Sequence, residues 1–382
     1  IFILGGGVEI SKSKNKLSKL FANYKIPYVT TWSGKDCCFY GQKNYVGTIG
    51  VYGSRAANFA VQNSDFILNF GSRLDTRITG ANPGTFARNA KIVSIDIDKN
   101  ELNKQRGLKN YLKLNYNLGD FLKKFNKKAK YSCDISWLEK CEEWNINYPN
   151  VLENWRKQKK LTNPYFFIEI LSEELNNKDI IIADDGAHLT WAVQAFKIKK
   201  GQRFFSAFGN SPMGYALPAS IGASLVKNKK RVICIDCDGS LQINLQELHT
   251  LVVNKLPVKI FILNNNGYGI IKQFQELYLS KRFEASGKGV SNPDFKKIAT
   301  AFGINYSEIR NHKNLRFHIR KIVNSNKPEF VNVLVKPNQK IIPKLQFGKP
   351  IEDLSPLLNR KEFSKNMLIK KINKNSKIIE IN

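Results

Sequence analysis

Long apolar runs are missing from this sequence. No stretch approaches the roughly 20 apolar residues that a membrane-spanning helix requires. The apolar start Ile1–Leu4 is too short for a signal peptide and lacks its basic flank. Cysteine is sparse as well, with six residues in a chain of 382. A disulfide framework is therefore excluded, and we expect reduced thiols, no membrane partner and a cytoplasmic location.

Two pairs of cysteines nevertheless stand close together. Cys234 and Cys237 have the spacing of a redox or zinc pair, but no second pair lies nearby and Cys234 sits inside an apolar run. Cys37 and Cys38 are adjacent, with no histidine near them. We interpret all four as reduced thiols rather than metal ligands.

Acidic residues are few relative to basic ones. Asp and Glu together number 31 against 61 Lys and Arg, which gives a net charge of +30. Such a charge can indicate nucleic-acid binding through phosphate contacts. The lysines are, however, spread along the whole chain amid abundant Ile and Asn, with denser groups at 123–130 and 365–377. We interpret this as a compositional bias with solvated faces, and expect no specific nucleic-acid partner.

The pattern of apolar runs predicts an α/β protein with two doubly wound parallel-sheet domains. Strand-like runs that end in glycine or aspartate alternate with helical patterns, and the length suffices for two cores. Tryptophans amid charged residues predict amphipathic helices between the two domains. The predicted parts are a central domain at 1–125, a helical linker at 126–163, a C-terminal domain at 164–340 and a tail at 341–382.

An aspartate follows one predicted buried strand, and two asparagines close the next. Asp238 comes after the apolar run Val232–Ile235, and Asn265 after the run Val258–Leu263. Leucines at helical spacing predict a helix over 242–254 between the runs. A βαβ unit brings both strands parallel, so we expect Asp238 and Asn265 at the same carboxyl edge of one sheet.

These side chains suit a hard cation. Carboxylate and amide oxygens are ligands that Mg²⁺ prefers, and Gly239 and Gly267 would allow the backbone to approach a ligand closely. The sequence therefore predicts a site for Mg²⁺ that carries a phosphorylated ligand. A purely structural strand-helix-strand unit, with a capping Asp and a turn, is the alternative.

The spacing between Asp238-Gly239 and Asn264-Asn265 resembles the diphosphate-binding motif of thiamine diphosphate enzymes. The wider segments 238–248 and 256–265 are similar to the large subunit of acetolactate synthase. The resemblance implies that Asp238 and Asn265 bind Mg²⁺ by side chain and Gly267 by its carbonyl, with Gly239 and Ser240 at the cofactor. In one departure, Cys237 replaces the first glycine of the family's Gly-Asp-Gly.

Other segments of the second predicted domain resemble the same family. In Gly186–Trp191 the resemblance implies diphosphate contacts from Gly186 and His188, although a structural loop histidine fits the sequence equally well. Met213 would hold the cofactor in its bent form, with core filling as the alternative. Ile270 and Phe274 would line the substrate pocket at positions where the family commonly has Met and Trp, which leaves the acceptor substrate open.

The first predicted domain is similar to the family's central domain, which holds FAD. Gly5-Gly6-Gly7 after a strand favours a tight turn or a phosphate contact. The resemblance implies that Arg73 and Arg77 lie near a flavin diphosphate and Asp96 near the adenosine; surface ion pairing with Asp75 is the alternative for both arginines. Tyr52 and Ser54 depart from the family pattern, so FAD retention stays open.

The resemblance implies decarboxylation of small 2-oxo acids such as pyruvate, followed by carboligation, in a homodimer or homotetramer of branched-chain amino acid biosynthesis. It also implies an activating glutamate in a preceding domain. Because the sequence starts on an apolar strand without Met, we expect that domain to be missing and residues 1–382 to be inactive alone, with no catalytic residue among them. Another thiamine diphosphate enzyme, a 2-oxo acid decarboxylase or cyclic diketone hydrolase, is one alternative, and a non-catalytic cofactor-binding module is another.

Overall fold

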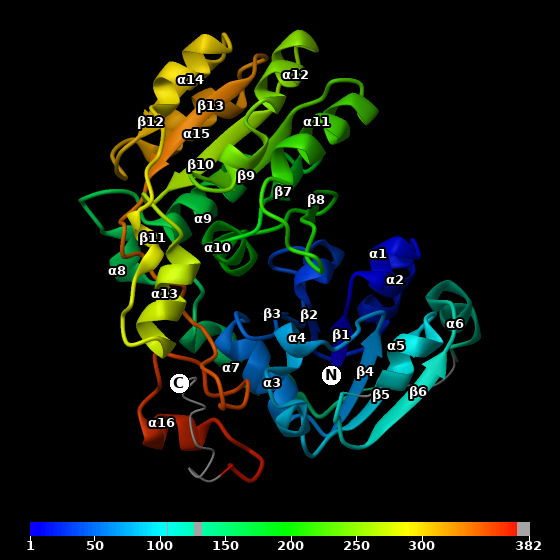
Figure 1. Ribbon diagram of the computed structural model, residues 1–382. Helices are drawn as coiled ribbons and strands as arrows, with labels where there is room; N and C mark the ends of the chain where they lie inside the picture. The colour runs from blue at the N-terminus through cyan, green and yellow to red at the C-terminus, as the bar shows by residue number, and fades with distance from the viewer. Residues whose placement is uncertain (105, 126–131, 373–382) are drawn as a thin grey trace. The chain divides into compact units, whose positions relative to one another are not determined.

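A computed structural model describes residues 1–104, 106–125 and 132–372. The described residues form two compact units. The first consists of residues 1–149 together with the segment that starts at Ile342, and the second spans Asn150–Ile341. Each unit is built around one six-stranded sheet with helices on its faces (Figure 1). The expectation of two doubly wound α/β domains is therefore confirmed.

The sheet of the first unit has the strand order β3-β2-β1-β4-β5-β6, and all five pairings are parallel. Its strands are β1 (Phe2–Leu4), β2 (Tyr28–Thr30), β3 (Tyr45–Thr48), β4 (Phe66–Phe70), β5 (Lys91–Asp96) and β6 (Tyr111–Asn115). The order reverses between β1 and β4, because the chain first builds outward on one side of β1 and then on the other. Such a switch point is where doubly wound sheets bind ligands.

Helices of the first unit follow the strands along the chain. They are α1 (Gly7–Ile10), α2 (Lys14–Asn23), η1 (Trp32–Cys37), α3 (Arg55–Asn63), α4 (Thr76–Thr79), η2 (Pro83–Thr85), α5 (Lys99–Lys104), α6 (Leu118–Lys124), α7 (Ile135–Asn147) and α16 (Arg360–Lys365). Helix α3 shows why the sequence folds this way: the Ser54 side chain caps its start by accepting from the amide of Ala57, and its Ala and Phe side chains are buried in the core.

The second unit repeats the plan with the order β12-β13-β10-β9-β7-β8, again all parallel. Its strands are β7 (Ile180–Ala183), β8 (Arg203–Phe205), β9 (Val232–Cys237), β10 (Lys259–Asn264), β12 (Asn305–Ile309) and β13 (Glu329–Leu334), with β11 (Glu284–Gly289) apart from this sheet. Strands β9 and β10 are apolar and buried along nearly their whole length, as expected for central strands covered on both faces.

Nine helices occur in the described part of the second unit. They are α8 (Glu153–Arg156), α9 (Pro164–Glu174), α10 (Ala187–Ala195), α11 (Ala216–Val226), η3 (Leu241–Asn244), α12 (Glu247–Val253), α13 (Gly269–Tyr278), α14 (Phe295–Ala301) and α15 (Leu315–Val323). Eight of these are α-helices. The single helix predicted over 242–254 is divided into η3 and α12, although Leu245 and Gln246 between them keep helical backbone angles.

The predicted linker and tail are distributed differently from the expectation. Helix α7 belongs to the first unit, where Trp144 packs against Phe59 at 5.7 Å between ring centroids, and α8 belongs to the second unit. The segment from Ile342 returns to the first unit: Asn58 donates to the Ile351 carbonyl, and Asn63 to the Asn366 carbonyl. The predicted boundaries of the family's domains stay a prediction.

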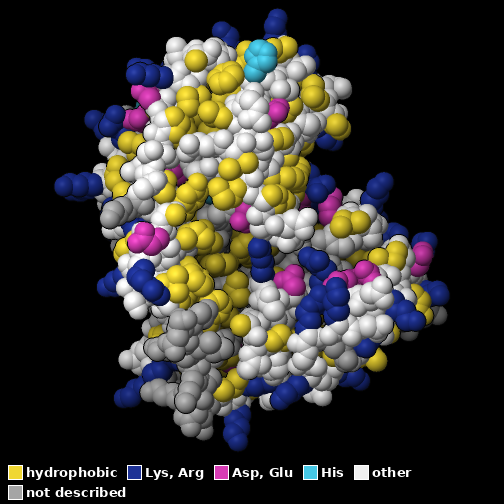
Figure 2. All heavy atoms as spheres, viewed as in Figure 1, with side chains coloured by type: hydrophobic (Ala, Val, Ile, Leu, Met, Phe, Trp, Pro, Cys, Tyr) yellow, Lys and Arg dark blue, Asp and Glu magenta, His cyan; other side chains and the backbone are white. Residues whose placement is uncertain are grey.

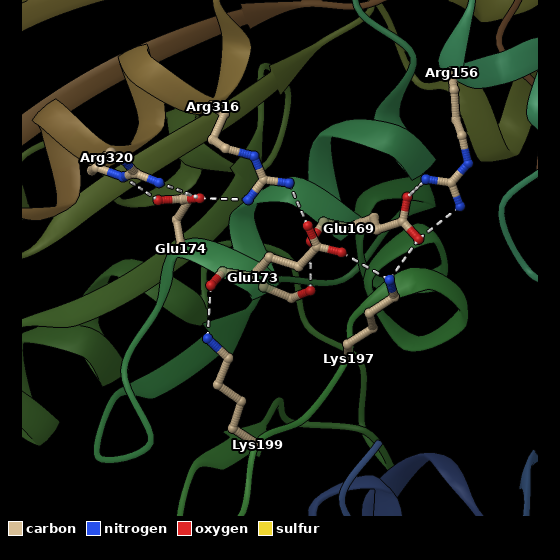
Figure 3. Close-up of polar contacts among 9 residues, drawn as sticks. Arg156, Glu169, Glu173, Glu174, Lys197, Lys199, Arg316 and Arg320 are labelled. Atoms are coloured by element: carbon tan, nitrogen blue, oxygen red, sulfur yellow. Dashed lines mark hydrogen bonds and ion pairs between the residues drawn. The ribbon is translucent and has the colours of Figure 1, made fainter. Parts of the chain in front are cut away.

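A buried ion-pair network ties α9 to its neighbours in the second unit (Figure 3). Glu169 of α9 is 2% exposed and pairs with Arg156 of α8 and with Lys197, the latter at 2.9 Å. Further along α9, Glu174 pairs with Arg320 of α15 at 2.7 Å. The network joins α9 to α8, to the segment after α10 and to α15.

Lysine and arginine side chains are distributed over both units on the face seen in Figure 2. Within the part of the chain that the structure describes, no helix combines the length and the apolar character needed to cross a membrane.

Candidate functional site

The carboxyl ends of β7, β9 and β10 place the predicted metal and diphosphate residues together. The strand order of the second sheet reverses between β7 and β9, and β9 pairs in parallel with β10, Cys237 lying opposite Leu263. Asp238 therefore follows β9 at the same edge where Asn265 follows β10. This confirms the topological expectation, and the switch point of the second sheet is the candidate site.

One carboxylate oxygen of Asp238 accepts hydrogen bonds, and the other has no partner among the described residues. The side chain is completely buried, and its Oδ2 accepts hydrogen bonds from the Gly267 amide at 2.9 Å and from Asn292 Nδ2 at 2.8 Å. Its Oδ1 is buried without a hydrogen-bond partner among the described residues. Burial raises the pKa of this carboxyl, and the bonds from Asn292 and Gly267 oppose the rise. An unpartnered buried oxygen of this kind is costly unless a ligand satisfies it.

The loops after β9 and β10 carry a buried amide side chain and two closely packed glycines at the same edge. Asn265 is 4% exposed, and its Nδ2 also lacks a hydrogen-bond partner in the described chain. Gly267 has φ of +149°, and a Cβ there would lie 2.6 Å from the Ser286 carbonyl oxygen. At Gly239 a Cβ would lie 2.4 Å from the Tyr268 ring. A side chain at either position would force its neighbour to shift, so glycine allows these two loops to pack closely at the sheet edge.

Strand β7 delivers a second buried aspartate that shapes the Met213 segment. Asp184 accepts from the amides of Gly214 at 2.9 Å and Ala216 at 2.6 Å. It thereby fixes the turn just before α11. Met213 lies in this turn and is half-buried. Sequence reasoning identified Met213 but not Asp184, whose role depends on a contact across 30 residues.

Gly186 and His188 lie where β7 passes into α10. Gly186 has φ of +145°, and a Cβ there would lie 2.8 Å from the His188 ring. His188 is 1% exposed, and neither of its ring nitrogens has a hydrogen-bond partner among the described residues. The sequence left open whether this histidine is a satisfied loop residue. The structure shows no intramolecular hydrogen bond that satisfies it.

Asp236, within β9, lies beside this histidine. Burial and the neighbouring Asp184 raise the pKa of Asp236 to about 7. Its Oδ1 accepts from the Cys237 amide at 2.8 Å and from the Ser240 hydroxyl, whereas its Oδ2 is buried without a described partner. The Ser240 hydroxyl, predicted at the cofactor, is thus directed to Asp236.

The predicted substrate-pocket residues share one face of α13. Ile270 and Phe274 are four residues apart on this helix and both are half-buried. The Phe274 ring lies 5.0 Å from that of Tyr278. Gln273 on the same helix is buried and exchanges hydrogen bonds with the backbone of Ile341, which anchors α13 to the chain that follows β13.

Asn292 is another residue at this edge that sequence reasoning did not single out. It lies between β11 and α14, and besides Asp238 it donates to Asn266 Oδ1 at 3.2 Å. An Asn before a Pro in a loop is a common turn signal, so the sequence gives no hint that this side chain reaches a carboxylate 54 residues earlier.

The first unit has its own switch point, between β1 and β4. A Cβ at Gly5 would lie 2.2 Å from the Gly71 carbonyl oxygen, so the loops after the two strands approach too closely for side chains. Arg73 pairs with Asp75 at 3.9 Å, and both are partly exposed. The Arg77 guanidinium lies over the Trp32 ring at 5.9 Å. The two arginines thus follow β4, next to the strand that ends in Asp96.

Asp96 and two departures from the family pattern have structural partners in this unit. Asp96 Oδ1 accepts from the Asp98 amide at 3.0 Å. The Tyr52 ring lies 5.6 Å from that of Trp32, and the ammonium of Lys344 lies 5.8 Å from the Tyr52 ring. Ser54 caps α3. Aromatic and cationic side chains therefore lie close together in this unit near Arg77 of α4.

Comparisons with known proteins agree with this arrangement. Residues 1–125 match the description "Thiamine pyrophosphate enzyme, central domain", and residues 184–333 match "Thiamine pyrophosphate enzyme, C-terminal TPP binding domain". The chain belongs to the thiamine pyrophosphate enzymes, the name used there for thiamine diphosphate, and carries these two domains of the family.

Within this family the chain is similar to large subunits of acetolactate synthase. It is 32% identical over 357 residues to the acetolactate synthase large subunit of Cyanidium caldarium, covering 91% of this chain and 60% of the relative. The isozyme 2 large subunit of Escherichia coli (strain K12) is 29% identical, with 89% and 60% covered. Acetolactate synthase 2, chloroplastic, of Nicotiana tabacum is 31% identical, with 93% and 54% covered. The chain thus spans 54–60% of the length of these curated relatives.

Proposed function

We propose that this chain is the cofactor-binding part of a thiamine diphosphate- and Mg²⁺-dependent enzyme that decarboxylates a 2-oxo acid and joins the product to an acceptor, as in acetolactate synthase. The observation that carries the proposal is the buried Oδ1 of Asp238, which has no partner in the described chain. A divalent cation at this oxygen would remove the cost of burying it.

The residues at this edge fit Mg²⁺. Asp238 Oδ1, the side-chain oxygen of Asn265 and the carbonyl of Gly267 are hard oxygen donors, and Mg²⁺ commonly completes its shell with phosphate oxygens. The Gly267 carbonyl also accepts from the Gly269 amide at 3.1 Å, which leaves its second lone pair for a cation.

Residues that follow β7 and β9, together with the start of α10 and the turn before α11, would hold the cofactor. We place the diphosphate at Gly186, Gly239 and Ser240, His188 offers a ring nitrogen, and Met213 offers an apolar support for a bent ligand. When bound, thiamine diphosphate supplies the carbon nucleophile and the electron sink for decarboxylation. The protein's own tasks are to hold the diphosphate, to orient the cofactor and to exclude water.

We propose pyruvate or a similar small 2-oxo acid as substrate and a role in branched-chain amino acid biosynthesis, because the relatives are named acetolactate synthase. Ile270 and Phe274 on α13 would shape the pocket. FAD in the first unit is a further part of the proposal: Arg73 and Arg77 beside a glycine-lined switch point suit a diphosphate, and Asp96 suits ribose hydroxyls.

Other parts of the proposal concern the whole protein. The family resemblance implies that a glutamate outside residues 1–382 activates the cofactor, and that sites form between subunits of a homodimer or homotetramer. Experiments on activity therefore require the protein as the cell makes it.

Another thiamine diphosphate enzyme, a 2-oxo acid decarboxylase or a cyclic diketone hydrolase, is the second candidate. It is favoured by Phe274, Ile270 and Cys237, which depart from the residues that acetolactate synthases commonly carry. A cofactor-binding module without catalysis is a third.

Product analysis separates these candidates. The whole protein is incubated with pyruvate, thiamine diphosphate and Mg²⁺, and the products are measured. Acetolactate supports the proposal, whereas acetaldehyde favours the decarboxylase. Cofactor binding with no turnover of any 2-oxo acid or cyclic diketone would favour the binding module.

A further inference from the structure

Three side chains with metal-binding atoms lie close together at the carboxyl edge of the second sheet, where the diphosphate is proposed to bind. A ring nitrogen of His188, a carboxylate oxygen of Asp236 and the sulfur of Cys237 all lie within 4.8 Å of one another. His188 comes from the first turn of α10, and the other two are consecutive at the end of β9. Asp238, assigned above to Mg²⁺, is not part of this group.

Buried polar atoms of this cluster lack hydrogen-bond partners in the described chain, which points to a ligand. His188 is 1% exposed, with both ring nitrogens unpartnered in the described chain, and Asp236 is fully buried with its Oδ2 unpartnered. The sulfur of Cys237 lies 3.3 Å from the Ser240 hydroxyl. Buried polar atoms without partners are uncommon, and three such atoms here belong to two adjacent side chains.

The local charge also favours a cation. Asp184, Asp236 and Asp238 are all fully buried at the ends of β7 and β9. The carboxylate oxygens of Asp184 accept hydrogen bonds from the amides of Gly214, Ala216 and Asp185. Asp184 therefore contributes charge but needs no further ligand. Placing a divalent cation among buried carboxylates offsets their mutual repulsion.

The donor set selects the kind of cation. Imidazole nitrogen, carboxylate oxygen and thiolate sulfur are ligands of Zn²⁺ and its transition-metal neighbours, whereas Mg²⁺ avoids sulfur and takes oxygen. Zn²⁺ bonds of about 2.0–2.3 Å place neighbouring donors roughly 3.3–3.8 Å apart, so the side chains need to close by only about 1 Å.

We propose that His188, Asp236 and Cys237 form a binding site for a thiophilic divalent cation of the Zn²⁺ class, separate from the oxygen site on Asp238. Binding replaces the thiol proton, which passes to solvent, and leaves at least one coordination position open. Since an imidazole has two ring nitrogens, a metal on one still leaves the other for a diphosphate oxygen. The site depends on Cys237, the residue that replaces a glycine of the family pattern, and does not depend on the proposed enzymatic reaction.

Cobalt substitution tests the site directly. The whole protein, stripped with a chelator and kept reduced, is titrated with Co²⁺ alone, without thiamine diphosphate. We expect a sulfur-to-cobalt charge-transfer band and the visible bands of a tetrahedral Co²⁺ site at one ion per chain, both removed by Zn²⁺ and retained in excess Mg²⁺. Absence of the charge-transfer band, or its loss on addition of Mg²⁺, overturns the proposal.

Variants assign the band to its ligands. Cys237→Ser should abolish the charge-transfer band, and His188→Gln should weaken Co²⁺ binding. Cys234→Ala is the matched control, because Cys234 lies three residues earlier in the same strand but packs in the hydrophobic core. Asp238→Asn should keep the band even where it abolishes Mg²⁺-dependent cofactor binding, which separates the two sites. A band that survives Cys237→Ser or disappears in Cys234→Ala contradicts the assignment.

Discussion

Asn292 donates a hydrogen bond of 2.8 Å to Asp238 Oδ2, and this bond leaves Oδ1 as the free oxygen of the carboxylate. The bond joins the loop before α14 to the end of β9. A carboxylate with one oxygen held in this way is oriented before any cation binds, and such outer contacts commonly tune metal affinity.

Replacing this donor should therefore weaken metal-dependent cofactor binding. A hydrogen bond to a charged group contributes about 1.5–3 kcal/mol, and each 1.4 kcal/mol is about tenfold in affinity. We expect Asn292→Ala to lower the Mg²⁺-dependent affinity for thiamine diphosphate by roughly ten- to hundredfold, measured by calorimetry. Asn305→Ala, which removes an exposed amide bonded to Glu329, is the control. Equal affinities in the two variants would show that Asn292 does not position Asp238.

The ion pairs of Glu169 should stabilise the second unit. Its carboxylate is 3% exposed and binds both Arg156 and Lys197. Glu169→Ala removes the buried partner that Arg156 and Lys197 share and leaves each cation only a more exposed glutamate, so it should lower the free energy of unfolding by about 2–4 kcal/mol. Urea denaturation measures the change.

Glu153→Ala is a matched control because Glu153 binds the same Arg156 at 3.5 Å while its side chain is 68% exposed. Exposed pairs contribute about 0–1 kcal/mol, so this variant should unfold almost as the native protein does. A cost for Glu153→Ala as large as that for Glu169→Ala would contradict the role of burial.

Lys35 carries a buried ammonium in η1 of the first unit. Burial lowers its pKa to about 7, below the ordinary 10.5. Between these values the unfolded chain binds more protons, so stability should rise with pH from about 7 to 10 and the cost of burial should be greatest below pH 7. Since each pKa unit corresponds to about 1.4 kcal/mol, Lys35→Met should raise stability at neutral pH by on the order of 1–4 kcal/mol.

Denaturation between pH 6 and 10 would reveal this effect as a flattened pH profile in Lys35→Met. The exposed Lys109→Met controls for loss of a charge alone. If the profile keeps its slope without Lys35, that lysine is not the group that titrates.

Phe274 should influence the choice of acceptor. It is half-buried on α13, at the position where the family resemblance implies a tryptophan. If the acetolactate proposal holds, Phe274→Trp should raise the preference of the whole protein for 2-oxobutyrate over pyruvate as acceptor. Competition between the two acids, with both products quantified, measures the ratio. An unchanged ratio would mean that Phe274 does not contact the acceptor.

Features governed by local rules were predictable from the sequence. The parallel crossover rule placed Asp238 and Asn265 at one edge, and α3 forms where a capping serine precedes an apolar stripe. The bond from Asn292 to Asp238 and the pairs of Glu169 join distant segments. A sequence shows that such side chains exist but not which partners the tertiary fold gives them.

The cluster of His188 with Cys237 shows the same limit in another form. In the sequence, the three-residue spacing suggests Cys234 as a partner for Cys237, but Cys234 is buried in the hydrophobic core. The neighbour of Cys237 in space is instead a histidine from α10, brought there by the pairing of β7 with β9.

Isothermal titration of thiamine diphosphate in the presence and absence of Mg²⁺ tests the central claim most directly. We expect Mg²⁺-dependent binding to the whole native protein, abolished in Asp238→Asn and preserved in Glu247→Gln, which removes a charge from the nearby α12 outside the proposed site. Unchanged affinity in Asp238→Asn, or equal binding without Mg²⁺, would contradict the account.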